Sequence, residues 1–176
     1  MSLILTWMAS VLSLVMSLPI AVSQTAAVPD AAQAEATTKS LLSAFTGCDA
    51  VKMKDHFADR VEFVGDPQFL GEDRGRQVHR DLTRDQLMAA YTKMFGGANC
   101  EQWTQLVKQS KPTLTRATKD GTHAEDTTGV LPPAFVKAGD YVYELRFPGS
   151  GLDDVILFIL RPVGGQWKVA AHWADY

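Results

Sequence analysis

Three apolar segments near the C-terminal end constrain the fold more than any other feature of this chain. Residues 140–147 (DYVYELRF), 153–160 (DDVILFIL) and 166–173 (QWKVAAHW) are rich in β-branched and aromatic residues, and the turn sequences PGSG and PVGG lie between them. Such segments favour strands. Short turns join antiparallel neighbours, whereas parallel strands need a long crossover. The sequence therefore predicts an antiparallel meander.

Helical patterns precede this meander. Apolar residues recur at helical spacing from Glu35 up to Gly47, which is placed to end the helix, and a second short helix is expected over 49–58. The clearest helix start is at Thr83 and Gln86, which form a T-x-x-Q capping box, and two consecutive glycines end that helix. Helices first and strands last predict an α+β fold with an antiparallel sheet.

Three weaker segments also favour strands. The segment RVEFVGDP alternates briefly and breaks at Gly65, while residues 102–107 (QWTQLV) and 113–118 (TLTRAT) are moderate candidates. We expect all three to extend the sheet of the meander.

Alternation in the last segment divides its side chains between two faces. A period of two places five residues together on a predicted pocket wall: Trp167, Val169, Ala171, Trp173 and Asp175. His172 falls on the opposite face, toward solvent or a partner. An aromatic wall of this kind favours a flat apolar ligand.

The strand over 153–160 is apolar on both faces. One face carries Ile156, Phe158 and Leu160, and the other carries Val155, Leu157 and Ile159. About three small helices can cover a single face, so the other needs a second cover. We predict a homodimer through the outer face of the sheet, with a different partner chain as the alternative.

Composition excludes two classes of partner. The 176 residues are 46% hydrophobic and 21% charged, as in an ordinary globular domain. The net charge of -3 and a pI near 5.8 argue against nucleic acid, because phosphate binding requires clustered positive charge. The same acidity argues against a stable association with an anionic membrane.

The N-terminal segment has the layout of a secretory signal. Residues 3–22 are apolar, and small residues at Ala21 and Ser23 predict cleavage after Ser23, or after Ala27 as a second choice. An uncleaved membrane anchor is the alternative reading. We therefore expect a signal peptide over 1–23, a flexible lead over 24–34, a domain over 35–176, and a periplasmic or secreted location.

Cys48 and Cys100 are the two cysteines of the chain. An even number in an exported protein favours a disulfide. Two separate buried thiols are the alternative.

The order of these parts resembles the nuclear-transport-factor-2-like (SnoaL-like, cystatin-like cone) superfamily, which includes ketosteroid isomerase, scytalone dehydratase and polyketide-cyclase relatives. The segments HFADRVEFVGDP, TRDQLMAAYTKMFG and GGQWKVAAHWAD carry the resemblance over residues 35–176. The family fold implies a curved antiparallel sheet wrapped around about three N-terminal helices. It also implies a cone shape with one pocket, and frequent homodimers.

In ketosteroid isomerases the general base lies in a V-E-D-P stretch after the second helix. The stretch VEFVGDP offers Asp66 at that place, with Glu62 nearby and extra residues between the two. The resemblance implies Asp66 as the general base, and an ordinary turn residue is the alternative. The family's helical donor is a tyrosine on the first helix, and no tyrosine occurs in this sequence before Tyr91. If His172 faces the interior, it replaces Asp66 as the candidate for proton transfer.

Four residues are predicted to bind a ligand: Tyr91, Tyr143, Trp173 and Asp175. Core packing with a solvated terminal carboxylate is the alternative for the last two. The histidines are scattered without metal-ligand spacing, so we predict no metal and no cofactor. Four arginines before the capped helix could hold an anion, but interleaved acidic residues favour a solvated loop: Arg74, Arg76, Arg80 and Arg84.

Three functions fit these observations. The first is non-catalytic binding of a small apolar ligand or a protein partner by an exported single-domain protein. The second is a pocket enzyme of the isomerase, dehydratase or cyclase type. The third is an accessory subunit of an exported assembly.

Overall fold

A computed structural model describes residues 29–97, 99–121, 135–147 and 154–175. Its helices are α1 (Ala31–Thr46), α2 (Ala50–Lys54), α3 (Arg84–Met94) and α4 (Asn99–Gln109), with a short 3-10 turn, η1 (Pro67–Leu70). The strands are β1 (Phe57–Gly65), β2 (Val78–Thr83), β3 (Lys111–Arg116), β4 (Tyr141–Phe147), β5 (Asp154–Val163) and β6 (Gln166–Asp175). The predicted signal segment lies outside the described residues.

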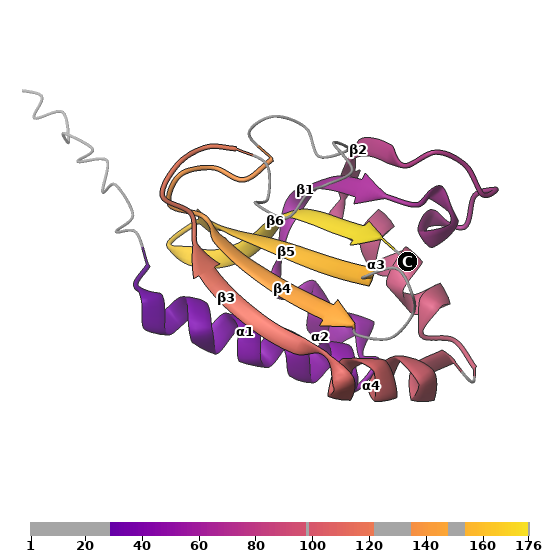
Figure 1. Ribbon diagram of the computed structural model, residues 1–176. Coiled ribbons are helices and arrows are strands. Elements are labelled where there is room, and N and C mark those ends of the chain that lie inside the picture. The colour runs from indigo at the N-terminus through magenta and orange to yellow at the C-terminus, as the bar shows by residue number, and fades with distance from the viewer. Residues whose placement is uncertain (1–28, 98, 122–134, 148–153, 176) are drawn as a thin grey trace, which may run out of the picture.

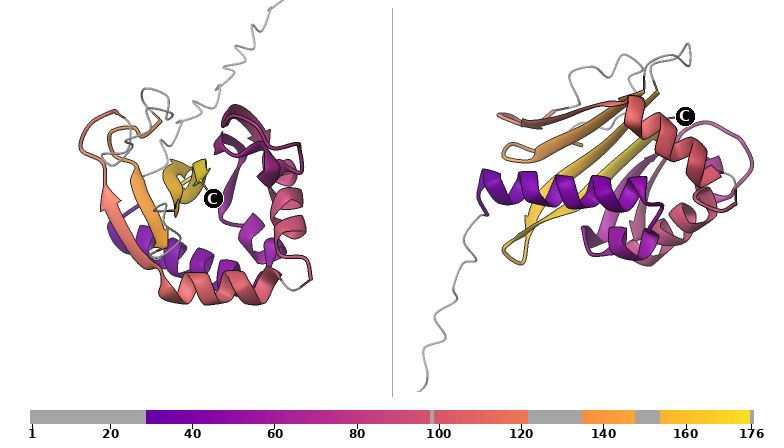
Figure 2. Two further views of the ribbon diagram at one scale, coloured as in Figure 1. Left: turned by 45° about the vertical axis from the view of Figure 1, so that its right-hand side comes forward. Right: turned by 90° about the horizontal axis from the view of Figure 1, so that it is seen from below.

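The six strands form one curved sheet in the order β2-β1-β6-β5-β4-β3. All neighbours are antiparallel except β1 and β6, which run parallel. The helices lie on the concave side, with α1 running beneath β4 and β3 (Figures 1 and 2). The predicted α+β fold with a curved sheet around N-terminal helices is confirmed, with β2 and β3 as the edge strands.

Local sequence explains the helix starts. Thr83 and Gln86 form the expected capping box of α3, in which each side chain bonds the other's backbone. Helix α1 begins earlier than the expected start at Glu35, because the Asp30 carboxylate accepts a hydrogen bond from the Gln33 N–H and caps the helix. Residues 31–34 therefore belong to the helix rather than to a flexible lead.

Two element predictions were wrong. Residues 102–107 form part of α4, not a strand, since Val107 packs inward while Leu106 stays 40% exposed, as on an amphipathic helix. The second helix ends at Lys54 and β1 already begins at Phe57, because Phe57 and Val61 bury their side chains on the sheet's concave face.

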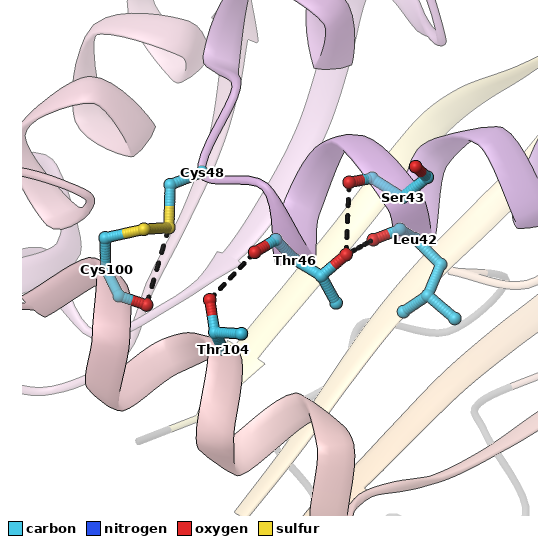
Figure 3. Close-up of a disulfide and its surroundings, with 6 residues drawn as sticks. All are labelled: Leu42, Ser43, Thr46, Cys48, Cys100 and Thr104. Carbon is cyan, nitrogen blue, oxygen red and sulfur yellow. Dashed lines mark hydrogen bonds between the residues drawn. A yellow bond between two sulfur atoms is a disulfide. The ribbon is translucent and has the colours of Figure 1, made fainter.

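A disulfide joins α4 to the end of α1 (Figure 3). The Cα atoms of Cys48 and Cys100 are 5.8 Å apart, and the Thr104 hydroxyl of α4 donates a hydrogen bond to the Thr46 carbonyl of α1. The predicted bridge is confirmed. It fixes α4 against the helix that carries much of the core.

A β-bulge in β6 changes which side chains face the helices. Ile159 pairs with Ala171 while Leu160 pairs with Val169, so one residue of β6 is left over between them. Trp167 packs in the core beneath the helices, as predicted, but after the bulge Trp173 packs on the outer face of the sheet. The predicted face assignment of Trp173 was therefore wrong by one residue, and His172 points into the interior.

The outer face of the sheet is covered from within the chain. Leu157 and Ile159 are fully buried there and lie in one apolar cluster with Phe135 and Val136. Arg161 anchors this cover, because its Nε donates to an Asp140 carboxylate oxygen at 3.0 Å and its Nη2 donates to the Phe135 carbonyl. A partner is thus not needed to bury these residues, and the homodimer stays a prediction.

Candidate functional site

A buried histidine and a buried tyrosine meet in the interior between the helices and the sheet. His172 of β6 and Tyr91 of α3 are both fully buried, and the His172 Nε2 lies 2.8 Å from the Tyr91 hydroxyl. The ring of Phe158 stacks on the imidazole with centroids 4.9 Å apart, and Phe57 and Phe69 contact it at their edges. This pair brings two polar groups together in an otherwise aromatic part of the core.

Hydrogen bonding fixes the tautomer of His172. Its Nδ1 lies 2.9 Å from the Leu157 carbonyl, which can only accept, so Nδ1 carries the proton. Nε2 then accepts a hydrogen bond from the Tyr91 hydroxyl. Burial lowers the pKa of His172 to about 4, with the Leu157 hydrogen bond opposing the shift. The imidazole is neutral at pH 7, and both of its nitrogens are already used.

Asp66 lies at the start of η1 rather than beside His172 in the core. Its carboxylate accepts a hydrogen bond from the Gln68 N–H at 2.8 Å and caps this 3-10 turn. Such a contact is typical of aspartate before proline in a turn. The observed role of Asp66 is that of a capping residue, and its role as a base stays untested.

The arginines before α3 are engaged with carboxylates at the surface. Arg80 forms a two-pronged ion pair with Glu72, and Arg84 pairs with Asp59 at 3.0 Å. Arg74 is exposed. These pairs agree with the predicted solvated loop and argue against an anion site there, because the paired arginines are already bonded to carboxylates.

A cleft of about 360 Å³ lies between α1 and the strands β3 and β4. Its walls combine apolar and polar side chains, among them Glu35, Thr38, Lys39 and Leu42 of α1, Leu114 of β3, and Tyr141 and Tyr143 of β4. A volume of this size suits a small molecule. One of the predicted ligand-binding residues, Tyr143, therefore lines a cleft.

The hydroxyl of Tyr143 has no hydrogen-bond partner among the described residues, although the side chain is only 5% exposed. Burial raises the pKa of Tyr143 to about 12. The hydroxyl oxygen itself is not fully buried, so it can bond water or a ligand in the cleft. The cleft thus holds a polar group that a ligand could satisfy.

Besides a cleft of about 370 Å³ at Cys48 and Phe95, two other clefts of similar size are lined largely by groups that are already bonded or packed in the core. One lies beside Trp167 and Lys168, but the Trp167 indole N–H donates to the Asp30 carbonyl and the Lys168 ammonium donates to the Asp55 carbonyl. The other lies over Phe69 and Trp103, whose rings close the core. The Tyr143 cleft combines a predicted ligand-binding residue with a second aromatic ring, Tyr141, and we take it as the candidate site.

The structure separates the four residues that the sequence grouped. Tyr91 lies in the core, and Trp173 lies on the outer face with its indole Nε1 lacking a hydrogen-bond partner there. Asp175 ends β6, and the prediction for its side chain lies outside what the structure describes. Sequence reasoning missed Leu42, Leu114 and Tyr141, because which helix faces which strand is not encoded locally.

In the described ranges, no three His, Cys, Asp or Glu side chains gather in a way that could hold a metal ion. None of the helices within those ranges is long and apolar enough to cross a membrane.

Comparison with known proteins gives likenesses of fold. No family model and no curated protein matches this chain. An NTF-2-like protein of unknown function from Shewanella oneidensis is 10% identical, with 82% of this chain and 98% of that chain covered and a TM-score of 0.45. A ketosteroid isomerase-like protein from Erwinia carotovora atroseptica is 15% identical, with 82% and 93% covered and a TM-score of 0.42.

A third solved structure, a cystatin-like fold domain of unknown function from Nostoc punctiforme, is 11% identical. It covers 83% of this chain and 78% of that chain with a TM-score of 0.40. These descriptions name the NTF-2-like and cystatin-like group that the sequence resembles. At such identities the likeness concerns the fold alone, so the site has to be argued from its own residues.

Proposed function

We propose that this protein binds a small apolar molecule, without chemically changing it, in the cleft between α1 and the strands β3 and β4. The observation that carries the proposal is the Tyr143 hydroxyl, which belongs to a largely buried side chain lining the cleft, is not itself fully buried, and bonds no described residue. Tyr143 and Tyr141 give the cleft an aromatic floor, and Leu42 and Leu114 give it apolar walls. A mostly apolar cleft with few polar groups is the usual form of a small-molecule site.

Binding is favoured over catalysis because the interior pair has no free proton-transfer atom. Both nitrogens of His172 are hydrogen-bonded, and the side chain has no exposed surface. A substrate would have to displace Tyr91 before it could reach Nε2. The cleft, by contrast, opens to solvent and needs no rearrangement of the core.

Titration of the protein with the fluorescent probe N-phenyl-1-naphthylamine tests the proposal. We expect saturable binding that Leu42→Gln weakens at least about tenfold, since a polar side chain replaces an apolar wall. Tyr143→Phe should weaken binding about two- to tenfold if the hydroxyl bonds the probe's amine.

Leu106→Gln is the matched control, because Leu106 is an exposed leucine of α4 that does not line the cleft. It should leave the affinity for the probe unchanged. Equal affinities for the wild type and Leu42→Gln would place the bound probe elsewhere and refute the proposal.

A further inference from the structure

A stretch of the chain beside the cleft is strongly cationic. Between Glu101 and Asp120 the sequence contains no acidic residue and four basic ones, in a chain whose net charge is -3: Lys108, Lys111, Arg116 and Lys119. All four are exposed, and none forms an ion pair with a described residue. The edge strand β3, which is one wall of the cleft, runs through the middle of this stretch.

Arg116 contacts the aromatic floor from β3 just outside the residues that line the cleft, whereas Lys39 of α1 lines it directly. Arg116 pairs with Tyr141 across β3 and β4, and both side chains therefore lie on the same face of the sheet. The Arg116 guanidinium carbon lies 5.9 Å from the centre of the Tyr141 ring, within the range of a cation–π contact. This contact positions the guanidinium and leaves its N–H groups without a carboxylate partner among the described residues.

The charges of α1 at the cleft balance each other. Glu35 and Lys39 both line it and lie one helical turn apart. Arg116 therefore leaves a positive surplus at the end of the cleft near Tyr141. A guanidinium fixed on a ring with free donors suits a planar or tetrahedral oxyanion, which it can bind through two parallel hydrogen bonds.

Resting on the proposed binding function, we infer that the molecule taken by this cleft carries one anionic oxygen group on an apolar body, and that Arg116 binds this group. The apolar body lies on Tyr141, Tyr143 and Leu42. The class includes aromatic and fatty carboxylates, sulfonates and phosphates, which share this chemistry.

Two probes with the same ring system test the inference. 8-Anilinonaphthalene-1-sulfonate carries a sulfonate on the skeleton of N-phenyl-1-naphthylamine, which is neutral. We expect the sulfonate probe to bind about fivefold more tightly at low ionic strength, an effect of the size of one exposed charge-assisted contact. Arg116→Gln should remove this preference and leave the affinity for the neutral probe unchanged.

Lys119→Gln is the matched control, since it removes the same charge from the same stretch beyond the end of β3. It should change the affinity for the sulfonate probe less than twofold. Equal affinities for the two probes, or a preference that survives Arg116→Gln, would overturn the inference while leaving the proposed function intact. Insensitivity of both probes to Leu42→Gln would refute the proposed function itself.

Discussion

Two tyrosines on the concave side of the sheet show how the interior differs from the cleft. Tyr91 is fully buried and Tyr143 is 5% exposed, so burial alone hardly distinguishes them. The Tyr91 hydroxyl bonds His172, whereas the Tyr143 hydroxyl bonds no described residue. Most polar groups in a stable core form hydrogen bonds within the chain, while a binding site has polar groups that can form hydrogen bonds with a ligand. Hydrogen bonding therefore distinguishes these two tyrosines, although an unpaired group alone does not mark a site, since the Trp173 Nε1 is also unpaired in the outer apolar cluster.

Truncation of a ring in the interior should have the largest effect on stability. Phe158 is fully buried, and its ring contacts Phe45, Phe57 and His172. Phe158→Ala should lower the free energy of unfolding by about 3–5 kcal/mol, because the rigid neighbours cannot fill the space left. Urea denaturation followed by tryptophan fluorescence measures the loss.

The matched change in the cleft is Leu114→Ala. Leu114 is half-buried on the edge strand β3, so its truncation should cost about 1 kcal/mol. Comparable losses for Phe158→Ala and Leu114→Ala would mean that the cleft is packed as tightly as the core, and the comparison would fail.

Acid should act on the interior through His172. Its pKa is about 4 in the folded protein, below the ordinary value of 6.5, so the unfolded chain takes up a proton first as pH falls. The free energy of unfolding is therefore unaffected by His172 above about pH 6.5 and decreases as the pH falls. At pH 4 the protonation of His172 in the unfolded chain has lowered it by about 3 kcal/mol. Urea denaturation at pH 7 and pH 4.5 measures the decrease.

Other groups contribute to the acid dependence, so His172 needs its own readout. Burial also lowers the pKa of His56, while it raises that of Asp140. NMR titration of the His172 ring signals should show a neutral imidazole at pH 5. A midpoint near pH 6.5 for those signals would contradict the buried, hydrogen-bonded state.

The sequence predicted those features that depend on local chemistry. A few neighbouring residues are enough to predict the capping box at Thr83 and the strands of the meander. The number of cysteines is enough to predict the pairing of Cys48 with Cys100. The strand predicted over 102–107 was wrong because amphipathic helices and short strands share apolar residues, and tertiary packing decides between them.

The candidate site was less predictable, because it depends on one bulge and on one packing contact. The extra residue of β6 exchanges the faces of Trp173 and His172, and no glycine or proline in that strand marks the bulge. The cleft arises where α1 meets β3, two segments more than sixty residues apart in the sequence. The sequence predicted Tyr143 as a ligand-binding residue, but it could not predict which residues of α1 and β3 line the cleft with it.

The two tyrosine hydroxyls can be compared directly, and Tyr143→Phe has the smallest predicted effect on stability. Tyr91→Phe removes the donor to the His172 Nε2 and leaves a buried acceptor without a partner, which should lower the free energy of unfolding by about 1–3 kcal/mol. Tyr143→Phe removes a hydroxyl that bonds no described residue, so stability should change by less than about 0.5 kcal/mol or increase slightly. Thermal and urea denaturation of both variants at pH 7 measure the difference. A loss for Tyr143→Phe as large as that for Tyr91→Phe would show that the chain itself satisfies the Tyr143 hydroxyl, and the main support for a ligand in this cleft would be gone.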